Sequence, residues 1–136
     1  MDSPAASSRR GLTGTELYAL PTILIVEDEP TIRSLLCDLL SSHGCTPVKS
    51  AEEGLLLLAE TTFDLAITDV RLPGMGGAEF LREARRLAPE MPVIIVTGAD
   101  GDEAKYIEAG AFGYLLKPFL FGEVEELVSR ALGRRG

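Results

Sequence analysis

The chain has 136 residues, a formal net charge of -8 and a hydrophobic content of 46%. This length suits one domain with its own core, and the composition is typical of a globular protein and excludes a disordered one. The net negative charge argues against the basic surface with which proteins bind nucleic acid. The sequence has no apolar run long enough to span a membrane and no secretory signal, which predicts a cytoplasmic protein without a membrane partner.

Residues 1–20 are rich in small and polar side chains and show no sustained period, which predicts a flexible leader. The domain is predicted over residues 21–133, with a short tail over 134–136. From residue 22 onward, short aliphatic runs alternate with segments of helical period, a pattern typical of strand–helix units around a parallel sheet. Strands are predicted at 22–27, 46–49, 63–68, 92–97 and 112–116.

Helices are predicted between these strands. The first begins at Pro30, whose missing N–H costs nothing in a first turn, and Ser50 caps the second. The first helix presents an apolar face that includes Leu35, with Arg33 on the opposite face, and the third helix presents an apolar face that includes Leu87. The later helices are predicted at 51–60, 77–88, 100–109 and 121–132.

The helix predicted at 100–109 has Ala104, Ile107 and Ala109 as its inner face and Gly110 as its stop. Five strands that alternate with five helices through right-handed crossovers predict an α/β fold, a doubly wound (βα)5 sandwich of three layers.

Polar side chains follow the predicted strands at their carboxyl ends. The first strand ends in Glu27 and Asp28, the third in Asp69, the fourth in Thr97 and the fifth in Lys117. Ligands of open α/β sheets bind at this edge. Three carboxylates in one cleft repel each other unless a divalent cation lies among them, and oxygen ligands suit Mg²⁺ or Mn²⁺. A hydroxyl and an ammonium group beside that cation suit phosphoryl transfer, with an aspartate as the candidate nucleophile.

Four stretches in this order resemble the receiver domains of bacterial two-component response regulators. They are "ILIVEDEP" at 23–30, "DLAITDVRLPGMGG" at 64–77, "PVIIVTG" at 92–98 and "AGAFGYLLKPF" at 109–119. The resemblance covers about residues 22–132. It implies a five-stranded parallel sheet in the order 2-1-3-4-5.

The resemblance also implies a phosphorylation site. Asp69 would accept a phosphoryl group from a sensor histidine kinase or a histidine phosphotransfer protein. Glu27 and Asp28 would hold Mg²⁺ directly or through water, with Asp69 and the backbone carbonyl of Arg71 completing the metal site. A domain of this family is not a conventional enzyme, although it assists its own phosphorylation and dephosphorylation.

In the same family, Thr97 and Lys117 would bind the phosphoryl oxygens, and the Lys117–Pro118 peptide bond would be cis. Thr97 and Tyr114 would form the switch, in which the hydroxyl moves toward the phosphate and the aromatic ring turns inward. The surface of the fourth helix, fifth strand and fifth helix would then control a downstream protein partner, as a monomer or a phosphorylation-linked dimer. A static, half-buried Tyr114 is the simpler alternative.

Other functions remain open at this point. A haloacid dehalogenase-type phosphotransferase also uses a strand-end aspartate, but its second acid would stand where Arg71 is. A flavodoxin would need a glycine- and hydroxyl-rich phosphate loop where this chain has Glu27, Asp28 and Glu29. The chain could also be a receiver excised from a hybrid histidine kinase or a larger regulator, or a degenerate receiver that binds a partner without phosphorylation.

Overall fold

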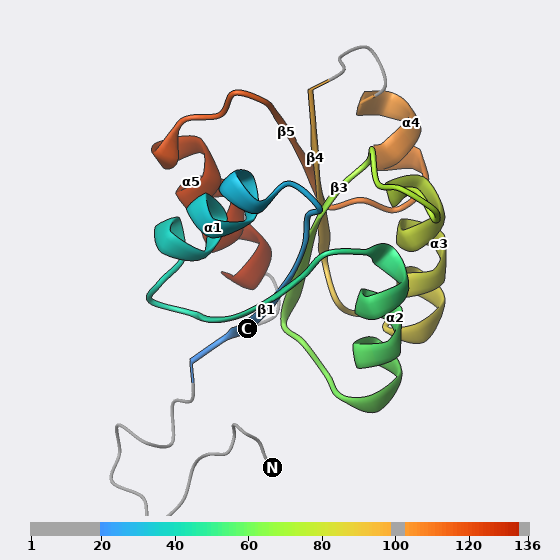
Figure 1. Cartoon of the computed structure of the whole chain (residues 1–136). Helices are drawn as coiled ribbons and strands as arrows, with labels where there is room; N and C mark the ends of the chain where they lie inside the picture. Colours follow the sequence, from blue (N-terminus) through green and yellow to red (C-terminus); the bar gives the residue numbers. More distant parts are fainter. Residues whose placement is uncertain (1–19, 99–102, 134–136) are drawn as a thin grey trace, which may run out of the picture.

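In the computed structural model, residues 20–98 and 103–133 are described, and strands and helices alternate along them (Figure 1). The strands are β1 (Thr22–Val26), β2 (Gly44–Val48), β3 (Leu65–Asp69), β4 (Val93–Thr97) and β5 (Gly113–Leu116). The helices are α1 (Pro30–Leu39), α2 (Ala51–Glu60), α3 (Gly77–Leu87), α4 (Glu103–Glu108) and α5 (Phe121–Gly133). The strands are parallel and lie in the order β2-β1-β3-β4-β5, which confirms the predicted doubly wound fold.

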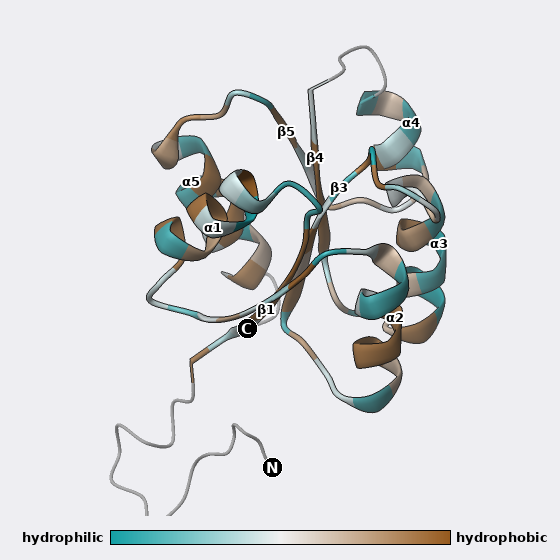
Figure 2. Ribbon diagram, viewed as in Figure 1, coloured by the Kyte–Doolittle hydropathy of each residue, from teal (hydrophilic) through white to brown (hydrophobic). Residues whose placement is uncertain are grey.

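Two layers of helices cover the sheet. Helices α1 and α5 lie on one face and α2, α3 and α4 on the other (Figure 1). Every residue of β3 and β4 is buried, because both faces of these central strands are covered. The apolar side chains form one cluster on each side of the sheet. Figure 2 shows the same division, with hydrophobic strands at the centre and hydrophilic turns on the outer sides of the helices.

Local signals in the sequence place the ends of several helices. Glu29 caps α1 by accepting the N–H of Ile32 at 2.8 Å, and Pro30 occupies the first turn as predicted. Ser50 caps α2, also as predicted. Gly110 follows α4 with a φ of 109°, a left-handed conformation that glycine adopts without steric cost.

Several predicted boundaries are wrong by one or two residues. Strand β1 ends at Val26, one residue before its predicted end, because the chain turns there toward α1. Strand β2 begins at Gly44, whose N–H donates to the Pro21 carbonyl at 2.8 Å. Strand β3 reaches Asp69, and β4 and β5 each begin one residue later than predicted. Of the predicted leader only Leu20 is described, and the tail over 134–136 and the start of the predicted fourth helix, 100–102, lie outside the described residues.

The predicted inner face of α4 is wrong. Tyr106 is the buried residue of this helix, and its ring centroid lies 6.5 Å from that of Tyr114 on β5. Ala104, Ile107 and Ala109 are exposed. A helix of 6 residues is anchored by one large aromatic side chain, and this fixes which side faces the sheet.

Two predicted inward leucines are also partly exposed. Leu35 on α1 is 41% exposed and Leu87 on α3 is 39% exposed. Each lies at the margin of the apolar stripe of its helix, whose buried residues include Leu36 on α1 and Phe80, Leu81 and Ala84 on α3. By contrast, the predicted inward face of α5 is buried throughout and comprises Val124, Leu127, Val128 and Ala131.

One edge of the sheet is formed by β2, and Pro47 lies within it, opposite Ile25 of β1. Gly44 donates its N–H toward Pro21, and Val48 accepts the N–H of Glu27 through its carbonyl. Backbone groups alternate in direction along a strand, so the even-numbered positions of β2 face β1 and the ring nitrogen of Pro47 faces away from the sheet.

Candidate functional site

The turn between β1 and α1 holds the first two acids of the site. Glu27 is 1% exposed, and its N–H donates to the Val48 carbonyl at 3.1 Å. Its Oε2 accepts the N–H of Glu29 at 3.2 Å. Asp28 follows and is exposed. Because β1 ends before Glu27, the two side chains are released from the alternation of a strand and can converge on one ligand.

Asp69 is the last residue of β3 and is 6% exposed. Its Oδ1 accepts the N–H of Arg71 at 3.0 Å, and its Oδ2 accepts a hydrogen bond from Nζ of Lys117 at 2.7 Å. The same ammonium group lies 3.4 Å from Oε1 of Glu27. Lys117 therefore connects the end of β3 to the turn after β1.

The three carboxylates gather as the sequence predicts. One oxygen of each of Glu27, Asp28 and Asp69 lies within 4.8 Å of the others. Oε1 of Glu27 is buried and accepts no hydrogen bond among the described residues, although Lys117 is nearby. A buried acceptor without a hydrogen bond, beside two further carboxylates, fits a hard cation with oxygen ligands.

The charges of the site change its acid–base behaviour. Burial raises the pKa of Glu27 to about 7, the charge of Asp69 adds to this effect, and the Glu29 N–H and Lys117 oppose it. Burial lowers the pKa of Lys117, but its hydrogen bond to Asp69 and the charges of Asp69 and Glu27 outweigh burial and raise that pKa above its ordinary value. Lys117 therefore stays charged at neutral pH, whereas Glu27 titrates near it.

The raised pKa of Glu27 predicts a pH-dependent stability in the absence of metal. The folded protein binds this proton more tightly than the unfolded chain, so stability is present below the ordinary pKa of 4.5 and is lost as pH rises through about 7. The Glu27→Gln substitution removes this loss. In EDTA, we expect its unfolding free energy to gain about 2 kcal/mol over wild type between pH 5 and pH 8. Urea unfolding at several pH values measures the difference.

Glu29→Gln is the control for this measurement, because its carboxylate lies in the same turn and caps α1 without joining the cluster. Its stability difference from wild type should stay nearly constant over the same pH range. Parallel pH profiles for Glu27→Gln and wild type would contradict the burial of a costly charge at this position.

The remaining predicted site residues lie at or near the carboxyl ends of β4 and β5, on the same side of the sheet as the acidic cluster. Thr97 ends β4 and is 1% exposed, and its carbonyl accepts the N–H of Lys117 at 2.7 Å. The Lys117–Pro118 peptide bond is cis, as predicted. Tyr114 on β5 is half-buried and packs against the cluster under α4. The N–H of Arg71 holds Asp69, whereas the metal contact of the Arg71 carbonyl remains a prediction.

Sequence reasoning missed two residues that shape the site. Arg33, predicted on the outer face of α1, is half-buried and its Nη1 donates to the Glu27 carbonyl at 2.9 Å. Gly77 was predicted only as the first residue of the helix at 77–88. A Cβ at this position would lie 2.5 Å from Cα of Val70 and closer still to the carbonyl oxygen of Asp69. No local pattern in the sequence signals this close approach, which arises only because α3 packs against the end of β3.

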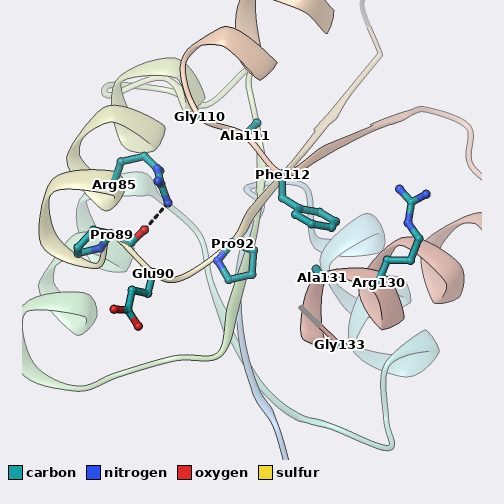
Figure 3. A pocket seen from close by; sticks show the side chains of 10 residues that line it. All are labelled: Arg85, Pro89, Glu90, Pro92, Gly110, Ala111, Phe112, Arg130, Ala131 and Gly133. Atoms are coloured by element: carbon teal, nitrogen blue, oxygen red, sulfur yellow. Dashed lines mark hydrogen bonds between the residues drawn. The ribbon is translucent and has the colours of Figure 1, made fainter. Parts of the chain in front are cut away.

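A cavity of about 1010 Å³ lies away from the acidic cluster (Figure 3). Its lining comes from the carboxyl ends of α3 and α5 and from the segments before β4 and β5. It therefore lies at the amino ends of the strands, whereas the acidic cluster lies at their carboxyl ends. Arg85 in its wall donates to the Pro89 carbonyl at 2.7 Å. This cavity and the acidic cluster share no residue, and the chemistry of the strand ends therefore does not involve it.

The fold and the cluster define the class: a three-layer α/β domain that gathers acids, a hydroxyl residue and a lysine at the carboxyl ends of its strands. A family model described as "Response regulator receiver domain" matches residues 23–130. The chain belongs to this family, as predicted, and is a receiver domain of two-component signalling. The match decides against the dehalogenase and flavodoxin alternatives.

Relatives support this assignment. The chain is 40% identical over 117 residues to the response regulator protein FleR of Pseudomonas aeruginosa, a match that covers 82% of this chain and 25% of FleR. It spans about a quarter to a half of the curated relatives that it matches.

Solved structures agree with the fold. A receiver domain from Clostridium thermocellum has a TM-score of 0.80 and 33% identity over 85% of this chain and 97% of that one. TrrA of Thermotoga maritima, solved in complex with Mg²⁺-BeF, has a TM-score of 0.77 and 31% identity over 83% of this chain and all (100%) of that one. Within the residues that the structure describes, no helix is long and apolar enough to span a membrane.

Proposed function

We propose that this receiver domain accepts a phosphoryl group on Asp69 from a sensor histidine kinase or a histidine phosphotransfer protein. The observation that carries the proposal is the gathering of three carboxylates within 4.8 Å, with Lys117 bonded to Asp69 at 2.7 Å. The domain over residues 21–133 works as a signalling switch in the cytoplasm rather than as a conventional enzyme.

Glu27, Asp28 and Asp69 would hold Mg²⁺, or Mn²⁺ in its place, with the backbone carbonyl of Arg71 as a further ligand. The buried Oε1 of Glu27 supports this fit, because a cation would satisfy it. When bound, the cation supplies positive charge that neutralises phosphoryl oxygens.

The residues of the chain orient the transfer. A carboxylate oxygen of Asp69 attacks the phosphorus of a phosphohistidine as the P–N bond breaks, and the bonding electron pair stays on the imidazole. The ring leaves in its neutral form when its other nitrogen carries a proton. The ammonium group of Lys117 already lies 2.7 Å from Asp69. Together with the Thr97 hydroxyl, it can donate hydrogen bonds to the phosphoryl oxygens.

The added phosphoryl group brings negative charge and new hydrogen-bond acceptors to a site that β3, β4 and β5 share. Thr97 and Tyr114 lie on β4 and β5 and connect the site with the packing under α4. Through them, phosphorylation would shift the α4–β5–α5 surface toward a conformation that binds a downstream protein, as a monomer or a phosphorylation-linked dimer.

The direct test is incubation with acetyl phosphate. With Mg²⁺ we expect intact-mass spectrometry to show one phosphoryl group per chain, which hydroxylamine releases because an acyl phosphate is labile to it. EDTA should prevent the labelling. A protein that stays unlabelled while another receiver domain is labelled in parallel would favour a phosphorylation-independent binding module instead.

A second experiment tests the cation site. Asp28→Asn removes one ligand charge of the cluster, so we expect the dissociation constant for Mg²⁺ to rise at least about tenfold. Isothermal titration calorimetry measures it. Glu29→Gln removes a charge from the same turn but leaves the cluster intact, and its Mg²⁺ affinity should stay close to wild type. Unchanged affinity in Asp28→Asn would refute the assignment of Asp28.

A further inference from the structure

The structure assigns a positioning role to Arg33 on α1. Its guanidinium group fixes the peptide unit between Glu27 and Asp28 and thereby turns both carboxylates into the cleft. This inference rests on the proposed function, because it concerns the cation site that these acids would form.

The geometry of the turn creates the need for such a residue. In an extended strand, consecutive side chains point to opposite faces, so neighbours such as Glu27 and Asp28 cannot reach one ligand. Here their carboxylate oxygens lie within 4.8 Å of each other and of Asp69. The peptide unit between Glu27 and Asp28 must therefore be held in an orientation that differs from that in a regular strand.

Arg33 holds this peptide unit from the first turns of α1. Its Nη1 donates to the Glu27 carbonyl at 2.9 Å, and its own backbone N–H donates to the Glu29 carbonyl at 2.9 Å. The side chain is half-buried, so the hydrogen bond is partly shielded from water and is strengthened by the guanidinium charge. The Glu27 carbonyl and the Asp28 N–H belong to one planar unit, and fixing the carbonyl fixes where Asp28 begins.

The other side-chain hydrogen bonds of this turn orient the Glu27 carboxylate and cap α1. The Glu29 N–H holds the Glu27 carboxylate at 3.2 Å, and the Glu29 carboxylate caps α1 through Ile32. Neither bond contacts the peptide unit between Glu27 and Asp28. The contribution of Arg33 is therefore separate from the capping of the helix.

Two roles of Arg33 predict opposite results, which makes the inference testable. If Arg33 acted only as a positive charge, it would repel a cation, and its removal would tighten Mg²⁺ binding. If it positions the two acids, its removal loosens the ligands and weakens Mg²⁺ binding. The sign of the change in dissociation constant distinguishes the two.

The experiment compares wild type with Arg33→Gln and Arg33→Lys by Mg²⁺ calorimetry and by amide hydrogen exchange of residues 27–29. For Arg33→Gln we expect the Mg²⁺ dissociation constant to rise about tenfold, faster exchange at the Glu29 N–H, and acetyl phosphate labelling that recovers at saturating Mg²⁺. Arg33→Lys keeps one donor and the charge, and should restore part of the affinity. Arg82→Gln, which changes an exposed arginine of α3, is the matched control and should leave all three readouts unchanged.

An equal or lower dissociation constant in Arg33→Gln would overturn the positioning role. If wild type itself binds no Mg²⁺ and accepts no label, the proposed function fails, and hydrogen exchange then decides about Arg33 alone. Unchanged exchange at Glu29 in Arg33→Gln would overturn the inference in that case too.

Discussion

Replacing Asp69 with asparagine is expected to abolish Mg²⁺-dependent labelling by acetyl phosphate. Asparagine keeps the shape of the side chain, and its Oδ1 can still accept the N–H of Arg71, which holds the wild-type carboxylate at 3.0 Å. It has no carboxylate oxygen that can form an acyl phosphate, however. Intact-mass spectrometry should show the label falling to the level of a sample without phosphodonor.

The fold should survive this substitution. Asp69→Asn removes a negative charge from a cluster of like charges, and Lys117 keeps Glu27 as a partner at 3.4 Å. Asp38→Asn, an exposed change on α1, serves as the control and should be labelled like wild type. Undiminished labelling of Asp69→Asn would show that another residue accepts the phosphoryl group.

A second large effect is expected at Gly77, the first residue of α3. An alanine Cβ there would lie 2.5 Å from Cα of Val70 and closer still to the Asp69 carbonyl oxygen. These contacts are with backbone, so no side-chain rotation can relieve them. We expect Gly77→Ala to lower the free energy of unfolding by about 3 kcal/mol and to slow labelling, because the end of β3 that carries Asp69 must shift.

Gly76→Ala is a control one residue away. Its Cβ would lie 3.6 Å from the Val70 carbonyl, an ordinary contact, and an alanine at this capping position should cost less than about 1 kcal/mol. Urea unfolding measures both variants. Similar stability losses in the two variants would mean that the approach of α3 to Asp69 is not as close as the structure has it.

The sequence predicted the fold because each element carries its own local signal. The aliphatic runs at β3 and β4 are buried on both faces, as their composition indicates, and Ser50 and Pro30 mark where helices begin. The strand-end acids were predicted for a related reason: parallel strands bring their carboxyl ends to one side of the sheet, and the strand order implied by the family resemblance places β1, which Glu27 follows, beside β3, which ends in Asp69.

The parts that the sequence could not predict depend on tertiary contacts. The inner side of α4 is set by the packing of Tyr106 near Tyr114, which no period within 6 residues can reveal. Arg33 looks like a surface residue in a helical pattern until the β1–α1 turn brings a carbonyl to its side chain. The importance of Gly77 appears only when α3 is placed against the backbone of β3.

Pro47 has a consequence for the molecule in solution. The edge strand of an open sheet is a template on which a further strand can add, and such growth leads to aggregation. Pro47 lies on the β2 edge with its nitrogen facing away from β1, so it offers no N–H to an incoming strand. The outer side of β2 therefore lacks one N–H group, and a further strand cannot complete its hydrogen bonds there, which opposes edge-to-edge self-association of the sheet.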